Sequence, residues 1–527
     1  MSVIETHPQI EEDQGHPRRW IILSVLLTSL VVVVIDNTIL NVAVRVLADP
    51  NEGLGANQSQ IAWAINSYTL VFAGLLFMAG VIADRIGRRR MLLIGLVLFG
   101  LASVAAAYSQ TPEHLIYARA FLGVGAAAIM PSTLAIISQV FSVKERGKAI
   151  GVWTASVGIG IALGPILGGA MLEIFWWGSI FLINVPIVIL GLILVRVFVP
   201  ESKAATNEKP DSIGVLLTIF GLVTVTYGVI RAGETGSWAT IDVWGTLLLG
   251  VLILFAFVRY ELRVKHPALD VRLFKESQFS SAIGAIAIVF FGAMGLFFFM
   301  SFYLQIVKGL SPFAVGLMMM AFAIGQLIFA PLSSTMNERF GARTVGVTAM
   351  SLISLVFLSY LFLNQDTPLW VPLVLFFLQA AAMANIMPPA MNTIMASLPK
   401  EKAGVGSAVA NAVRQAAGSL GVAGLGTILA TVYRADLTSN VDEELPDGAT
   451  ESIAATYGYT EEAGDPGGDV MSTAVDSFVS AMHVTAIIAG LVTAVGIFVA
   501  ARYFPRKTPL ENKSTPVASV AEPARVK

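Results

Sequence analysis

The segment Gly80-Val-Ile-Ala-Asp84-Arg85-Ile-Gly87-Arg88-Arg89-Arg90 joins two long apolar runs, and a degenerate copy of its centre, Glu338-Arg339-Phe340-Gly341-Ala342-Arg343, follows 254 residues later. Three further pairs keep the same order and nearly the same offset: Thr111-Pro112 with Thr367-Pro368, Ile129-Met130-Pro131 with Ile386-Met387-Pro388, and Lys144-Glu145-Arg146 with Lys400-Glu401-Lys402. Each match alone is weak, but together they indicate a duplicated chain. The offset spans eight apolar runs, so the two halves are expected to lie parallel in a membrane around a central cavity.

The composition indicates a membrane protein. Hydrophobic residues make up 56% of the 527 residues and charged residues only 13%, which excludes a soluble globular protein. A helix that crosses ~30 Å of hydrocarbon needs about 20 apolar residues. Fourteen such runs lie near 20–45, 60–83, 91–109, 113–138, 148–172, 179–199, 213–231, 242–260, 280–304, 313–335, 344–363, 369–394, 404–432 and 478–502. We therefore predict an all-α integral membrane fold with 14 transmembrane helices, arranged as 6+2+6.

The basic residues orient these helices. With the N-terminus inside, roughly 26 of the 33 Lys and Arg residues fall on the inner side and about 4 on the outer side, as the positive-inside rule requires. Both termini are therefore expected in the cytoplasm. The predicted parts are a cytoplasmic N-terminal tail (1–19), an N-terminal six-helix bundle (20–199), a linker with two extra helices (200–279), a C-terminal six-helix bundle (280–502) and a disordered cytoplasmic tail (503–527).

One long segment, 433–477, falls on the outer side of the membrane in this topology. It is acidic and rich in small residues, which is typical of a solvated loop. A lid over the outer end or a site for a partner is the less favoured alternative, because long segments without structure of their own are uncommon unless they are functional.

Several function classes are excluded by what the sequence lacks. It has no cysteine, five scattered histidines and a net charge of −2, so neither a metal site nor a nucleic-acid partner is expected. It lacks the phosphate-binding motif that a nucleotide-driven pump needs. No cluster of acids, histidines or nucleophiles lies at membrane depth, so an enzyme is not expected. The remaining class is a secondary transporter without a cofactor, for which a proton gradient is the expected energy source.

Asp36 is the one carboxylate clearly inside a predicted span, where ionisable groups are costly and usually functional. It lies roughly 9 residues, or ~13 Å, from the outer end of its helix, and Arg119 lies about 6 residues, or ~9 Å, deep in another helix. We hypothesise that Arg119 keeps Asp36 ionised until a proton or a cationic substrate competes. The alternative is a hydrogen-bonded acid that only orients helices.

Four segments resemble the major facilitator superfamily. Residues 80–90 resemble its signature inner loop, and Gly158-Ile-Gly160-Ile-Ala-Leu-Gly164-Pro165-Ile-Leu-Gly168-Gly169 resembles its antiporter motif, which marks exporters. The segment around Asp36 resembles the first-helix motif of the fourteen-helix drug:proton antiporters. The segment around Arg119 is similar to the fourth-helix motif, except that Leu122 replaces the usual glutamine. The resemblance implies a proton-coupled antiporter that exports amphiphilic drugs, antibiotics or related small molecules by rocker-switch alternating access.

The resemblance also implies roles for individual residues. The conformational switch is assigned to Gly80, Asp84, Arg85, Gly87, Arg88 and Arg89. In the antiporter motif, Gly160, Gly164 and Gly168 lie four residues apart and form one smooth helix face, with Gly169 beside it. Pro165 removes a helical hydrogen bond and favours a bend. Asp36 and Arg119 are the predicted proton-coupling pair.

Polar residues within the predicted spans are candidates for the substrate cavity. They are Asn37, Asn41, Tyr68, Gln326, Gln379, Asn385, Asn411 and Arg414. Gln379 and Asn385 are neutral amides, which more often join helices, and Arg414 favours anionic or neutral polar compounds over organic dications. Export of a specific endogenous metabolite or of lipid on the same fold stays an alternative. The expected partners are a small amphiphilic substrate, protons and the lipid bilayer, with the protein a monomer.

Overall fold

The computed structural model describes residues 15–203, 211–235, 237–264, 267, 269, 271–397, 403–441, 445–446, 448–462 and 468–504. Most of both predicted tails lies outside these ranges, as do residues 204–210 of the linker. The fold is all-helical, as predicted. Among the described residues, 13 helices are long and apolar enough to cross a membrane, or 14 if the two parts of one bent helix form a single span.

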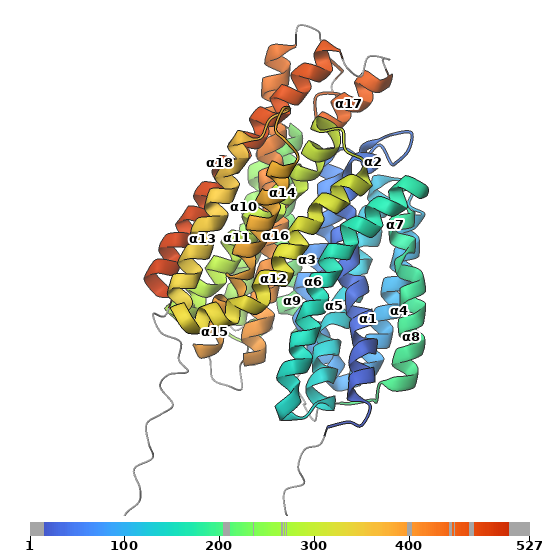
Figure 1. Cartoon of the computed structure of the whole chain (residues 1–527), viewed down its shortest axis with the longest axis vertical. Coiled ribbons are helices and arrows are strands. Elements are labelled where there is room, and N and C mark those ends of the chain that lie inside the picture. Colours follow the sequence, from blue (N-terminus) through green and yellow to red (C-terminus); the bar gives the residue numbers. More distant parts are fainter. Residues whose placement is uncertain are drawn as a thin grey trace, which may run out of the picture.

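The first half of the chain forms a bundle around its own apolar core (Figure 1). Its long helices are α1 (Arg19–Ile39), α3 (Gln58–Ile86), α4 (Arg88–Ala107), α5 (Pro112–Val140), α6 (Val143–Ile174) and α8 (Asn184–Phe198), and its short ones are α2 (Val44–Ala48) and α7 (Ser179–Leu182). Local sequence sets the helix starts. Asn57 and Gln60 form a reciprocal capping box at α3, and the Thr111 hydroxyl caps α5 ahead of Pro112.

The second half forms a similar bundle around a second core. It contains α11 (Ser277–Phe302), the π-helical turn Tyr303–Val307, α12 (Pro312–Phe340), α13 (Ala342–Ser359), α14 (Trp370–Ala384), α15 (Met387–Ala396), α16 (Ala403–Asn440) and α18 (Asp469–Tyr503). The described parts of the two ends of the chain lie at the same end of the molecule, which we call the terminal end (Figure 1). The opposite end, where the small helix α17 (Ile453–Glu462) lies, is called the α17 end.

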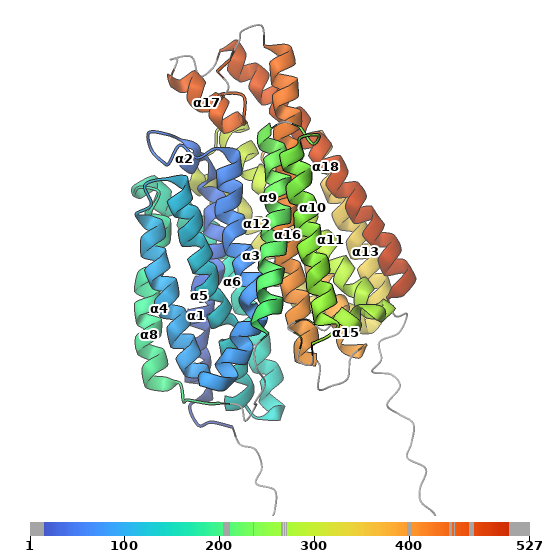
Figure 2. The same ribbon diagram turned by 180° about the vertical axis from the view of Figure 1, so that it is seen from behind.

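Two helices separate the bundles in sequence, and the first of them also lies beside both bundles in space. They are α9 (Ser212–Thr235) and α10 (Ile241–Glu261), and Figure 2 shows them at the junction of the two bundles. α9 packs against α10, against α3 of the first bundle and against α16 of the second. The Thr427 hydroxyl of α16 donates to the Val229 carbonyl of α9 at 2.7 Å, so α9 is bonded to the second bundle.

The segment 433–477 differs from the predicted solvated loop. α16 continues to Asn440, α18 begins at Asp469, and α17 lies between them. Tyr433 and Thr456 share a hydrogen bond of 2.5 Å in a buried position. Apolar side chains scattered among the small residues bury one face of these helices, which a composition argument does not detect. Residues 442–444, 447 and 463–467 lie outside the described part.

Three hydrogen bonds that join described residues of the two bundles lie toward the α17 end. Ser311 at the start of α12 donates to Glu173 of α6 at 2.6 Å, and Gln58 of α3 donates to the Gly426 carbonyl of α16 at 3.3 Å. Arg45 of α2 donates to the Tyr457 hydroxyl of α17 at 2.9 Å. The two bundles are therefore in direct contact at this end of the molecule.

Candidate functional site

A buried ion pair lies inside the first bundle, at the place that the sequence predicts. Asp36 near the end of α1 and Arg119 of α5 are 0% and 1% exposed, and Arg119 Nη1 donates to Asp36 Oδ2 at 2.5 Å. Arg119 Nε donates to the Ala64 carbonyl of α3 at 3.0 Å. Asp36 and Arg119, which the sequence places at similar depth on two different helices, are therefore in direct contact. Their hydrogen bonds join α1, α3 and α5.

Asn184, at the start of α8, is a third member of this cluster. Its amide Nδ2 donates to Asp36 Oδ1 at 2.9 Å and to the Ser103 hydroxyl at 3.2 Å. Both oxygens of the Asp36 carboxylate thus accept a hydrogen bond, which satisfies a charge held away from water. The signal for Asn184 in the sequence is weak, because a lone amide in an apolar run is usually a contact between helices.

Tyr68 differs from its predicted place in a substrate cavity. Its side chain is fully buried within the first bundle, and the Arg119 guanidinium lies 4.4 Å from the centre of its ring. The ring face attracts the cation, so Tyr68 supports the ion pair instead of contacting a ligand in this conformation. If Asp36 takes up a proton, its carboxyl group becomes neutral. The charge-assisted hydrogen bond from Arg119 then becomes weaker, because protonation removes the negative charge that attracts Arg119.

The 84–90 segment forms the tight turn between α3 and α4 at the terminal end. Gly87 has a φ of 118°, which only glycine adopts without strain. Arg88 Nε donates to Asp84 Oδ1 at 2.8 Å, and the backbone N–H of Arg89 donates to the carboxylate of Glu201 at 3.2 Å. Glu201 was not predicted; it follows α8 and caps the start of α4. Arg85 is exposed.

Gly80, which the resemblance assigns to the conformational switch, makes no close helix contact in this conformation. A Cβ atom there lies 3.9 Å from Pro131, an ordinary contact distance, so this conformation does not require a glycine.

We predict that Gly87→Ala destabilises the protein by roughly 1–3 kcal/mol, because alanine is strained at this φ. The new methyl group also lies 2.5 Å from the Glu201 carboxylate. The measurement is the thermal unfolding midpoint in detergent. Gly158→Ala is the matched control, because its Cβ meets nothing within 4 Å. Equal midpoints for the two variants contradict the prediction.

The antiporter segment presents two different faces on α6. The predicted smooth face packs on α1: a Cβ at Gly160 lies 2.8 Å from Val34, one at Gly168 lies 2.6 Å from Ile39, and one at Gly164 overlaps the Thr38 hydroxyl. Gly169 faces the second bundle instead, where its Cβ lies 2.5 Å from the Phe313 Cα of α12.

The contact with α12 is reciprocal. A Cβ at Gly316 of α12 overlaps the Pro165 carbonyl of α6. The motif therefore holds α6 against α1 on one side and against the other bundle on the other side. Glycine on both helices permits this backbone approach.

The other candidates for a substrate cavity fall into two groups. Half-buried in the structure are Asn37, Asn41, Gln326, Asn411 and Arg414.

Gln379 and Asn385 differ from the prediction, because both are buried within the second bundle. Gln379 accepts a hydrogen bond from the Tyr360 hydroxyl at 2.8 Å, and Asn385 donates to the Ala381 carbonyl of its own turn at 2.8 Å. These amides therefore join or terminate helices, which is the commoner role of such groups.

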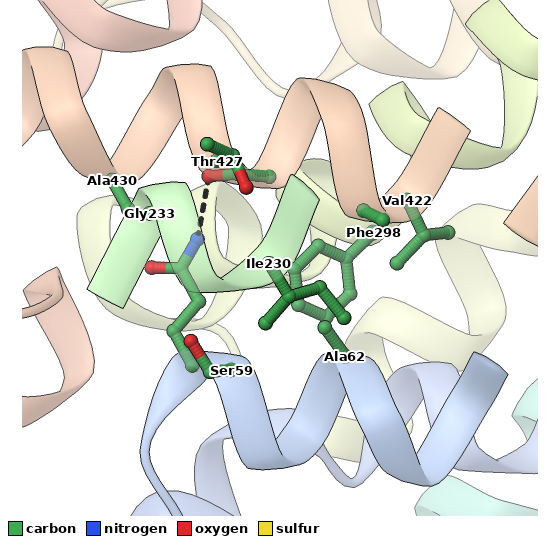
Figure 3. Close-up of a pocket in the computed structure, with 11 residues that line it drawn as sticks. Ser59, Ala62, Ile230, Gly233, Phe298, Val422, Thr427 and Ala430 are labelled. Carbon is green, nitrogen blue, oxygen red and sulfur yellow. Dashed lines mark hydrogen bonds between the residues drawn. The ribbon is translucent and has the colours of Figure 1, made fainter. Parts of the chain in front are cut away.

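A small pocket lies at the junction of α3, α9 and α16, with the Phe298 ring of α11 at its side (Figure 3). Ala62, Ile230 and Val422 form its apolar wall. It has room for about one water molecule, far less than a drug-sized ligand needs. Within the described ranges, no group of three or more His, Asp or Glu side chains is arranged to hold a metal ion.

Comparison with known proteins places the chain in a family. Residues 20–422 match the Major Facilitator Superfamily. The chain is 34% identical over 424 residues to the methyl viologen resistance protein SmvA of Salmonella typhimurium, covering 80% of this chain and 84% of that protein. It is 33% identical over 478 residues to the multidrug efflux pump LfrA of Mycolicibacterium smegmatis, covering 90% and 94%.

The fold has solved counterparts as well. A bacterial homologue of the human lysosomal transporter Spinster, in an inward-facing and occupied conformation, matches with a TM-score of 0.64 at 18% identity, covering 93% of this chain and 98% of that one. The matched family consists of transporters, not enzymes. The chain therefore belongs to the major facilitator superfamily and is a multi-pass transporter of the cell membrane, related to multidrug efflux proteins.

Proposed function

We propose that this protein is a proton-coupled exporter of amphiphilic drugs, antibiotics or related small molecules. The observation that carries the proposal is the buried Asp36–Arg119 pair, a charged group that can take up a proton inside a chain related to drug-efflux proteins. The relatives support the class of cargo, and the antiporter segment supports export instead of uptake.

The proposed topology has 14 transmembrane helices as 6+2+6, with both termini in the cytoplasm. The bundles are residues 20–199 and 280–502, separated by α9 and α10. The excess of basic residues supports this orientation. The terminal end is then the cytoplasmic end, and α17 lies outside the cell.

Alternating access is the proposed transport cycle. In this orientation, the contact between Gly169 of α6 and Phe313 of α12 closes the outer end. The protein would load its substrate from the cytoplasm in the present conformation. Export then requires α6 and α12 to separate while the bundles rock about the substrate, the type of motion that parallel repeats permit.

Proton uptake at Asp36 provides the coupling. Protonation weakens the hold of Arg119 on Asp36 and frees α1 from α5, because a charge-assisted hydrogen bond becomes a neutral one. α1 packs against the glycine face of α6, and α6 in turn contacts α12. A proton that enters from outside can thus change the contact between the bundles through a chain of packed helices.

The test is proton movement in inverted membrane vesicles that contain the protein. We expect acidified vesicles to release protons when a transported compound is added, in a panel of dyes, antibiotics and lipids. A response to several unrelated amphiphiles supports multidrug export, whereas a response to one metabolite or to lipid alone favours the narrower alternative. No response to any compound contradicts the proposal.

A further inference from the structure

Arg414 of α16 carries a positive charge that no residue in the described part of the chain neutralises. It is the twelfth residue of α16, about 17 Å along the helix from its start at Ala403. Its side chain is half-buried, and its Nε atom is buried without a hydrogen-bond partner. Among the residues that the structure describes, Arg414 forms no ion pair.

Arg414 differs in this respect from the buried Arg119. Arg119 has its counter-ion in Asp36, so that pair is neutral as a unit. An uncompensated charge at membrane depth is costly, and such groups usually face a water-filled cavity and mark the path of a substrate. The partial exposure of Arg414 agrees with a position at the edge of such a space.

The surroundings of Arg414 are held in place and are aromatic on one side. The guanidinium lies 5.5 Å from the centre of the Phe290 ring of α11. About one turn further along, a Cβ at Gly418 would lie 2.9 Å from Met294 of α11, and about two turns along, one at Gly421 would overlap the Phe291 carbonyl. α16 and α11 are thus in backbone contact beside the guanidinium, which limits how far the two side chains can separate.

We propose that Arg414 recognises a carboxylate on an aromatic or amphiphilic substrate, which would make organic acids the preferred cargo. The proposal rests on the export function proposed above and narrows its substrate class. The planar guanidinium can donate two parallel hydrogen bonds to a carboxylate. Phe290 provides an apolar face for the ring of the substrate, and the half-buried amide of Asn411 lies about one turn before Arg414 on α16.

The test compares three probes that share one ring system and differ in charge: pyrenebutyrate, pyrenebutanol and pyrenebutylamine. Their dissociation constants are measured by fluorescence with the purified full-length protein in nanodiscs, without a proton gradient. We expect pyrenebutyrate to bind about 10- to 100-fold more tightly than pyrenebutanol, as a charge-assisted pair provides, and pyrenebutylamine to bind most weakly.

Arg414→Gln is expected to remove the preference for pyrenebutyrate and to leave the binding of pyrenebutanol unchanged, which also shows that the variant is folded. Arg414→Lys keeps the charge but loses the planar fork, so it should retain only part of the preference. Arg434→Gln is the matched control, because Arg434 lies on the same helix near the α17 end and donates to the Glu234 carbonyl. It should bind all three probes like the parent protein.

Two results overturn the proposal: equal affinity of the parent for the three probes, or an equal loss for all three in Arg414→Gln. The binding assay needs no proton coupling. A protein that shows the carboxylate preference but no proton-driven export would therefore refute the proposed function and keep this site. Proton-driven export without a preference for pyrenebutyrate would support the proposed function and refute this site.

Discussion

Asp36→Asn is expected to reduce proton-driven dye transport in inverted vesicles to the level of vesicles that lack the protein. Asparagine has nearly the shape of aspartate and still accepts a hydrogen bond from Arg119 or Asn184, but it takes up no proton. The measurement is dye accumulation under an imposed pH gradient, with expression matched to the parent. Exchange of dye between the two sides without a gradient should persist, because that exchange needs no proton.

Loss of folding has to be separated from loss of coupling in this experiment. Removing one partner of a buried ion pair costs about 3–5 kcal/mol, because Arg119 is left without its counter-ion. The double variant Asp36→Asn with Arg119→Gln removes both charges and should regain part of the lost thermal stability, yet stay uncoupled. Asp36→Glu keeps a titratable acid and should keep some coupled transport. Accumulation at the parent level in Asp36→Asn would show that another group couples the proton.

The Asp36–Arg119 pair can be predicted from the sequence because few assumptions are needed. An acid and a base inside apolar helices are rare, and helix geometry converts residue position directly into depth. Asn184 and Glu201 were not predicted as members of their sites. An amide or a carboxylate near a helix end has many ordinary roles, and only the folded arrangement brings Glu201 to the turn at Gly87.

The segment 433–477 and Tyr68 show that burial and side-chain direction are harder to predict from sequence than depth along a helix. Composition averages over 433–477, whereas burial depends on which face of a short helix carries the few apolar residues. For Tyr68, the sequence indicates which helix the residue lies on but not whether its side chain points toward a central cavity or into the bundle. The ring faces Arg119 inside the bundle, and an apolar helix with polar residues on more than one side gives no periodic signal to decide this.

α1 links the proposed proton site, Asp36, with the contact between the bundles. One face of α1 carries Asp36, which binds α5 and α8, and Thr38 on the same helix lies against Gly164 of α6. α6 in turn touches α12 through Gly169. The antiporter glycines therefore lie between the acid and the opposite bundle. A change at Asp36 has a direct mechanical route to the α17 end, and interrupting that route should stop transport without touching the acid.

Gly169→Val is expected to hold the α17 end open and to reduce transport strongly. Its Cβ would lie 2.5 Å from the Phe313 Cα and 2.6 Å from the Pro312 carbonyl, and backbone atoms do not move aside as a flexible side chain does. Overpacking of this kind costs about 1–3 kcal/mol, and it acts only in the state where α6 and α12 touch. The closed state should therefore become about 5- to 150-fold less populated relative to the open one.

The chain has no cysteine, so pairs of introduced cysteines report on this contact without background. Ser311 Oγ and Glu173 Oε1 lie 2.6 Å apart across it, so the pair Glu173→Cys with Ser311→Cys should be joined readily in the parent by a short bis-methanethiosulfonate cross-linker that spans the length lost with the glutamate side chain. Adding Gly169→Val should slow cross-linking and lower dye export together. Gly158→Val, on the same helix with open space at its Cβ, should change neither rate. Fast cross-linking and full export in Gly169→Val would mean that closure of the α17 end does not depend on this glycine contact.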